Sequence, residues 1–68
     1  MSDIYWTHAC ISSMKTNNKN MYNYAIFMIK DEQRKQLVDR IFELYTQNDE
    51  NTVKIINGFI LNVPIVVA

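Results

Sequence analysis

The stretch KDEQRKQLVDRIFELYTQNDEN, residues 30–51, decides most of the fold, because it is the least ambiguous segment of the chain. Its apolar residues recur at spacings of three and four, which places them on one face of a helix. These residues are Leu37, Val38, Ile41, Phe42, Leu44 and Tyr45. Asp31 is suited to accept hydrogen bonds from the free N–H groups of a first turn. The sequence therefore predicts an amphipathic helix from about residue 32 to residue 47 that packs on a sheet.

The sequence before this helix favours two strands. Residues 4–14, IYWTHACISSM, and residues 21–29, MYNYAIFMI, are rich in aromatic and β-branched side chains. The polar stretch KTNNKN lies between them, and its Asn residues tolerate turn conformations. We therefore expect an antiparallel hairpin in which Thr16 pairs with Met21. A helical interpretation of residues 4–14 stays open, because Ile4, His8 and Ile11 also fall at helical spacing.

The last part of the chain, TVKIINGFILNVPIVVA, alternates like a strand. Its apolar residues lie mostly at odd-numbered positions, so they would share one face of an extended chain. Asn57-Gly58 favours a two-residue hairpin turn, but a tight turn there would mix polar and apolar residues on each face. We favour one long strand interrupted at Gly58. A hairpin at this point and a short helix over residues 51–56 are the alternatives.

Together these elements predict an α+β fold over residues 1–68 as a single domain. A small antiparallel sheet, in chain order strand-strand-helix-strand with an optional further strand, would carry one amphipathic helix on one face. A domain of this size buries only about 60% of the surface of its unfolded chain. Because 49% of the residues are hydrophobic, we expect some apolar surface to remain exposed as an interface.

Composition narrows the function classes. Seven basic and seven acidic residues leave no net charge to attract a polyanion or a membrane surface. The single cysteine, Cys10, points to the cytoplasm, since secreted domains of this size usually need several disulfides. The start of the chain does not resemble a signal peptide, and the apolar end is too short for a membrane anchor. Eight Asn, nine Ile and five Lys are typical of AT-rich genomes, which include those of phages and mobile elements.

Few residues offer catalytic chemistry. His8 and Cys10 would share one face of the first strand, where a thiolate and an imidazole can form a nucleophile pair. A packed cysteine and a partly buried histidine are the more ordinary interpretation. No other Cys or His is available to complete a zinc site. One glycine excludes a glycine-rich phosphate loop. We therefore expect no enzymatic activity, no catalytic residue, no cofactor and no metal.

The sequence instead favours a small protein-interaction domain. It would self-associate, preferably as a dimer, or dock on another protein as an inhibitor or adaptor. Large aromatic side chains are common interface anchors, and an uncovered edge strand invites pairing. The predicted interface residues are Tyr5, Trp6, Tyr22, Tyr24, Phe59, Leu61, Val63, Ile65 and Val67.

Two alternatives remain. Lys15 and Lys19, on the predicted hairpin loop, could bind the phosphates of a nucleic acid single strand while Tyr22 and Tyr24 stack on its bases. The neutral charge balance weakens this hypothesis, because nucleic-acid-binding domains usually carry a basic patch. The other alternative is a pocket for a small ligand between two protomers.

Overall fold

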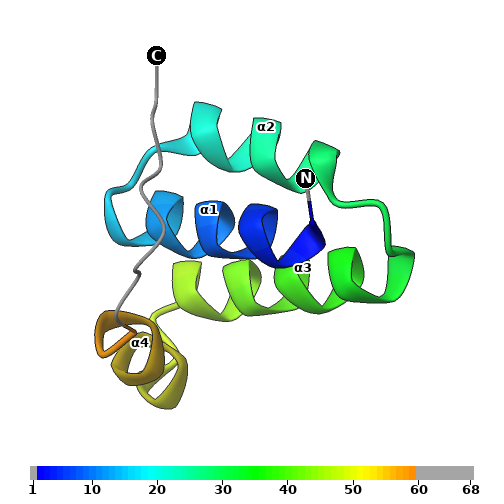
Figure 1. Ribbon diagram of the computed structural model, residues 1–68. Helices are drawn as coiled ribbons and strands as arrows, with labels where there is room; N and C mark the ends of the chain where they lie inside the picture. Colours follow the sequence, from blue (N-terminus) through cyan, green and yellow to red (C-terminus); the bar gives the residue numbers. More distant parts are fainter. Residues whose placement is uncertain (1, 60–68) are drawn as a thin grey trace.

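The computed structural model describes residues 2–59 and forms four α-helices over them. The helices are α1 (Asp3–Lys15), α2 (Lys19–Met28), α3 (Glu32–Thr46) and α4 (Glu50–Asn57) (Figure 1). No strand occurs within residues 2–59. The prediction of an α+β fold with an antiparallel sheet is therefore wrong, and this part of the chain is all-helical.

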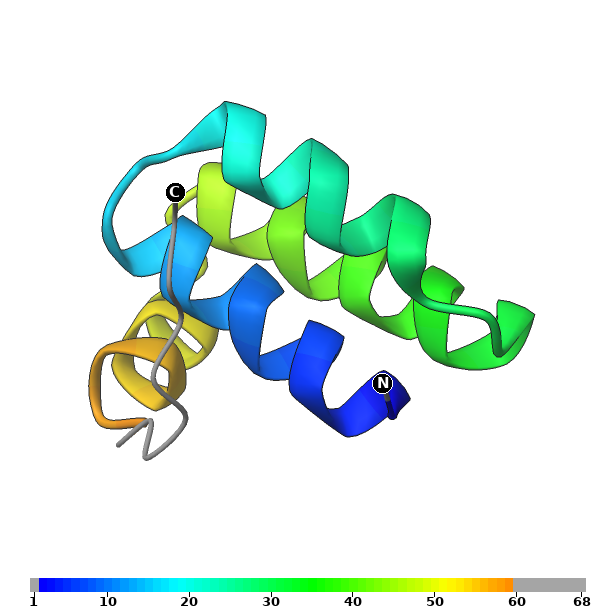
Figure 2. The same ribbon diagram turned by 45° about the horizontal axis from the view of Figure 1, so that its top comes forward.

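Helix α1 lies at the centre of the arrangement. It forms the most extensive helix pair with α2 and also contacts α3 and α4, while α3 contacts α2 and α4 as well. Helices α1, α2 and α3 follow each other in alternating directions, while α4 lies across one end of them (Figures 1 and 2). Because α1 is packed on several sides, its apolar residues do not form a single stripe. This is the physical reason why residues 4–14 resembled a buried strand.

Small side chains bring α1 and α2 close together. Cys10 and Ala25 are completely buried, and Ala9 and Ser13 are nearly so. Short side chains at a helix contact let the two backbones approach, and α1 and α2 form the most extensive helix pair in the described chain. The Ser13 hydroxyl donates to the carbonyl oxygen of Cys10 at 2.6 Å, so this buried polar group is satisfied.

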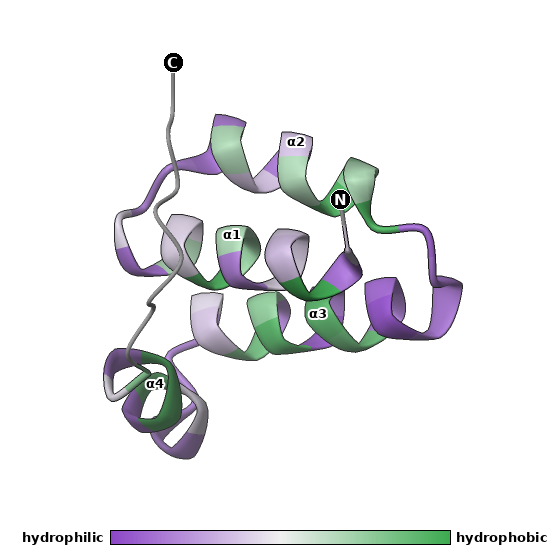
Figure 3. Cartoon of the chain, viewed as in Figure 1, coloured by the Kyte–Doolittle hydropathy of each residue, from purple (hydrophilic) through white to green (hydrophobic). Residues whose placement is uncertain are grey.

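The core gathers residues from all four helices and from the joint between α2 and α3. Its buried apolar members are Ala9, Cys10, Ile11, Met14, Tyr22, Ala25, Ile29, Val38 and Ile56. In contrast to this apolar core, the first turn of α3 is hydrophilic (Figure 3). Most of the apolar stripe predicted for α3 packs on the core: Val38 is buried, and Ile41, Phe42 and Tyr45 are partly buried against it. Leu37, also part of the predicted stripe, is instead 61% exposed.

The asparagine-rich stretches end helices rather than turn strands. Asn17 and Asn48 adopt left-handed backbone conformations, with φ of 55° and 60°. The residue after each of them donates its N–H to a carbonyl five residues back, which closes a helix C-terminus. Asn18 and Asp49 then accept backbone N–H groups of α2 and α4 as N-caps. The predicted hairpin around residues 15–20 is therefore wrong, and helix α2 replaces the second strand.

The predicted helix over residues 32–47 is confirmed as α3, which ends at Thr46. Asp31 caps it as expected, and its Oδ1 accepts the N–H groups of Gln33 and Arg34. The start of α1 is tied to this same region. Asp3 accepts the N–H of Lys30 at 3.1 Å and that of Asp31 at 2.9 Å. These two hydrogen bonds hold the pKa of Asp3 below its usual range.

The favoured interpretation of the C-terminal part is wrong where the structure describes it. Residues 50–57 form α4, which matches the short-helix alternative. Gly58 has a φ of −82°, so Asn57-Gly58 does not form the left-handed turn that a tight hairpin needs. The remainder of the predicted strand, with Leu61, Val63, Ile65 and Val67, lies outside the described residues.

Candidate protein-interaction surface

Two aromatic side chains project from α2 into solvent. Phe27 is 76% exposed and Tyr24 is 60% exposed. They lie three residues apart on the helix, so they are neighbours on its surface. Tyr22 and Ala25 are the buried residues of α2. Tyr24, Phe27 and two asparagines lie on the opposite side of the helix.

Two aromatic residues of α1 extend this surface, and one of them packs against the Tyr24 ring. The rings of Trp6 and Tyr24 meet edge to face with centroids 5.6 Å apart. Tyr5 packs against Trp6 in the same manner at 4.9 Å. Because Trp6 also packs against the core, it restricts the Tyr24 ring. We call the surface formed by Tyr5, Trp6, Tyr24 and Phe27 the aromatic face.

The α2 part of the aromatic face, Tyr24 and Phe27, lies in an uncharged stretch of the sequence. No residue from 20 to 29 carries a formal charge. Leu37, which is 61% exposed on α3, provides a contrast, because Arg34 and Arg40 lie one turn away on either side of it. A single exposed leucine among charges is an ordinary part of a solvated helix, whereas adjoining uncharged rings are typical of an interface.

The structure therefore brings together three of the predicted interface residues, Tyr5, Trp6 and Tyr24. It adds Phe27, which the sequence reasoning did not name. Phe27 could have been recognised as an interface residue only if residues 19–28 had been taken as a helix, because it then lies one turn after Tyr24. Phe59, another predicted interface residue, is partly buried and packs against the core, with its ring 5.7 Å from that of His8.

Tyr22 faces the core and not the aromatic face. It is 4% exposed, and its ring stacks on Phe42 with centroids 4.0 Å apart. Its hydroxyl donates to Oδ1 of Asp39 at 2.6 Å, which links α2 to α3. Burial raises the pKa of Tyr22, and the hydrogen bond to the Asp39 carboxylate raises it further. In this arrangement the ring stabilises the fold and has no free stacking surface.

The residues of the nucleic-acid hypothesis are dispersed. Lys15 donates from Nζ to the carbonyl oxygen of Phe59 at 3.0 Å. Lys19 begins α2 and is exposed, but it lies five residues before Tyr24, which turns it well away from that ring. Tyr22 is buried, Lys15 is exposed but is engaged with Phe59, and Lys19 and Tyr24 point in different directions.

His8 and Cys10 are also separated by the helix. Residues two apart on a helix point to nearly opposite sides. Cys10 is fully buried, and burial, followed by the nearby charge of Asp39, raises the pKa of its thiol to about 12. The Nδ1 atom of His8 is buried and has no hydrogen-bond partner within residues 2–59. Across the same residues, no group of three or more His, Cys, Asp or Glu side chains is placed to hold a metal ion.

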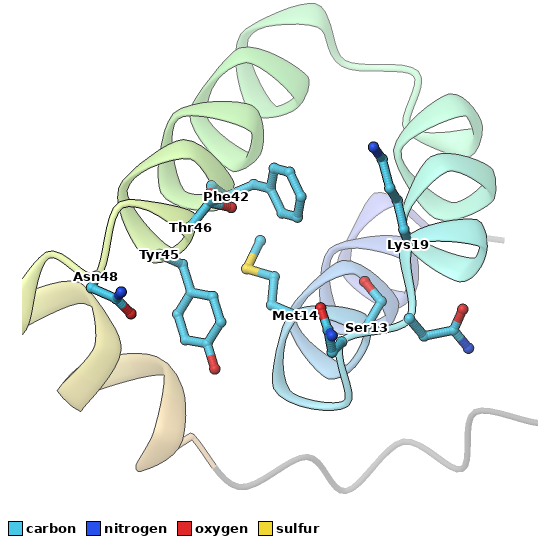
Figure 4. A pocket seen from close by; sticks show the side chains of 9 residues that line it. Ser13, Met14, Lys19, Phe42, Tyr45, Thr46 and Asn48 are labelled. Carbon is cyan, nitrogen blue, oxygen red and sulfur yellow. The ribbon is translucent and has the colours of Figure 1, made fainter.

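A hollow of about 430 Å³ lies between the two asparagine joints, one after α1 and one after α3. Figure 4 shows Met14, Phe42 and Tyr45 around it, with the other lining side chains at its margins. The lining consists of Ser13, Met14, Asn17, Asn18, Lys19, Phe42, Tyr45, Thr46 and Asn48. Lys19 is the one charged residue of this lining, and the lining contains no carboxylate, histidine or cysteine that could act as a base or nucleophile.

Among the described helices, none is long and apolar enough to cross a membrane. Comparisons with protein-family models, curated proteins and solved structures gave no match. The function must therefore be inferred from the surface of the chain itself.

Proposed function

We propose that this chain is a small non-catalytic protein-interaction domain that binds its partner through the aromatic face. One observation carries the proposal: Tyr24 and Phe27 lie side by side on α2, more than half exposed, in a stretch without charges. Exposed aromatic side chains of this kind are the usual anchors of protein interfaces, since burial of each removes a large apolar area from water.

The aromatic face is also prepared for binding. Tyr24 and Phe27 belong to a regular helix, and the Tyr24 ring packs against the half-buried Trp6. A side chain that is already restricted loses less conformational entropy when it becomes buried, so more of the contact energy appears as affinity. An adaptor or inhibitor role fits such a rigid, convex helix face, which can enter a groove of its target.

The absence of catalysis is part of the proposal. The best candidate pair, His8 and Cys10, lies on different sides of α1, and the raised pKa of Cys10 keeps its thiol protonated near neutral pH. We further propose a cytoplasmic location. A free, buried thiol as the single cysteine of the sequence is consistent with a reducing compartment.

Site-specific photo-crosslinking tests this proposal. A benzoyl-phenylalanine is placed at position 27 or, as a matched exposed control, at position 37, and the protein is irradiated in an extract of the cells that carry its gene. We expect position 27 to give defined protein adducts that excess wild-type protein abolishes and excess Phe27→Ser protein does not. Two results would contradict a specific role of the aromatic face. One is that position 37 gives the same adducts as position 27, and the other is that excess wild-type protein and excess Phe27→Ser protein remove the adducts equally well.

A further inference from the structure

We infer that the partner of the aromatic face is a second copy of this chain, with the two α2 helices packed antiparallel about a two-fold axis. This inference rests on the proposed function, because it names the partner of the same surface. It depends on three properties of α2: the spacing of its outward residues, their lack of charge and the area they expose.

The outward residues of α2 form a stripe that can pair with itself. Asn20, Tyr24 and Phe27 follow one another at spacings of four and three, with Asn23 beside them. A two-fold axis that passes between residues 23 and 24 sets Asn20 opposite Phe27 of the second copy. Each ring then meets a small amide side chain and not another bulky ring, and the opposed helix dipoles attract each other.

The charge pattern favours a second copy. A two-fold interface buries the same patch of both copies, so a patch that carries charges of one sign would face the same charges on its partner. Residues 20–29 carry no charge, so the paired stretch itself holds no like charges, and Lys19 and Lys30 lie beyond its two ends. The outward side of α3 would instead bring Arg34 and Arg40 of the two copies near each other.

The exposed area fits a small dimer interface. An aromatic side chain offers about 200 Å², so Tyr24 and Phe27 at 60% and 76% exposure present together roughly 270 Å² per copy. A stable interface needs at least about 600 Å² per partner, an eighth or so of the 4943 Å² surface. The two rings supply nearly half of that area, and Asn20, Asn23 and Tyr5 border them. We therefore expect a dimer at the small end of stable interfaces, whose formation depends on the protein concentration.

Sedimentation equilibrium of the purified full chain tests the inference. We expect wild-type protein to change from the 8.0 kDa mass of one chain to twice that mass as its concentration rises. Phe27→Ser should raise the dissociation constant about 30-fold or more, because a central aromatic anchor is lost from both copies. Leu37→Ser, a control at an exposed apolar residue on another helix, should leave it unchanged. Circular dichroism checks that all three proteins are equally helical.

Two results would overturn the inference. One is a wild-type chain that keeps the mass of one copy at every concentration, and the other is equal weakening by Leu37→Ser and Phe27→Ser. Wild-type protein could stay monomeric while position 27 still gives protein adducts that excess wild-type protein abolishes. In that case the partner is not a second copy of this chain, and the proposed function stands. If the adducts fail as well, both are excluded.

Discussion

Replacement of Tyr22 by phenylalanine isolates one polar link between α2 and α3. Tyr22→Phe keeps the ring stacked on Phe42 and removes the hydroxyl that donates to Asp39 at 2.6 Å. A hydrogen bond to a charged group contributes about 1.5–3 kcal/mol. Asp39 is exposed, so water can replace the lost donor, and phenylalanine leaves no unsatisfied group behind. We therefore expect a loss of about 1–1.5 kcal/mol in the free energy of unfolding.

Such a loss is measurable in a chain of this size. A domain of 68 residues has a total stability of about 3–10 kcal/mol, and each kcal/mol lost lowers the melting temperature by about 4–8 °C. Urea unfolding followed by circular dichroism gives the free energy directly. Tyr45→Phe is the matched control, because the Tyr45 hydroxyl makes a long contact of 3.4 Å to Asn57 at an exposed site. It should change stability by no more than about 0.3 kcal/mol.

A double-mutant cycle connects the effect to Asp39. In an Asp39→Asn background, Tyr22→Phe should lose less stability than in the wild type, because the charge that strengthens the hydrogen bond is already gone. Equal losses in both backgrounds, or a Tyr22→Phe loss no larger than that of Tyr45→Phe, would show that the hydrogen bond to Asp39 does not stabilise the fold.

Three further predictions follow from the described contacts. Burial raises the pKa of Cys10 from 9.0 to about 12, so stability should be constant below about pH 9 and fall as the pH rises toward about 12; urea unfolding should show a weaker decline for Cys10→Ala. The pKa of Asp3 is lowered, so its contribution should be present above about pH 4 and be lost as the pH falls further, and Asp3→Asn should weaken this acid dependence in the same assay. Asn48 has a φ of 60°, so Asn48→Ala should lower the free energy of unfolding by about 1 kcal/mol, whereas Asn51→Ala, at an exposed position inside α4, should not lower it.

The sequence was sufficient for α3 because this helix packs through one side only. Its apolar residues therefore repeat at helical spacing, and Asp31 marks its start. Helix α1 gives no such signal, because its buried residues are nearly consecutive and therefore cover several sides of the helix. They are Ala9, Cys10, Ile11, Ser13 and Met14. In α2 the exposed Tyr24 and Phe27 obscure the inward pattern of Tyr22 and Ala25.

The turn residues were ambiguous for a different reason. Asparagine tolerates the left-handed conformation that both a β-turn and a helix C-terminus require. At Asn17 and Asn48 the helix end uses this property, which becomes evident only when the preceding segment is known to be helical. The candidate site was partly predictable, because residue type alone singled out Tyr5, Trp6 and Tyr24. The inward orientation of Tyr22 and the exposure of Phe27 depended on the helix and were not predictable from strand parity.

Cross-linking through α2 tests most directly the central claim that this helix is the surface on which two copies meet. A short bismaleimide is added to purified Asn23→Cys protein and, as a control, to Gln36→Cys protein, which has its cysteine on an exposed position of α3. The native Cys10 is fully buried with a raised pKa, so it should not react. We expect a covalent two-chain product from Asn23→Cys that Phe27→Ser suppresses. Equal or faster cross-linking of Gln36→Cys would contradict this claim.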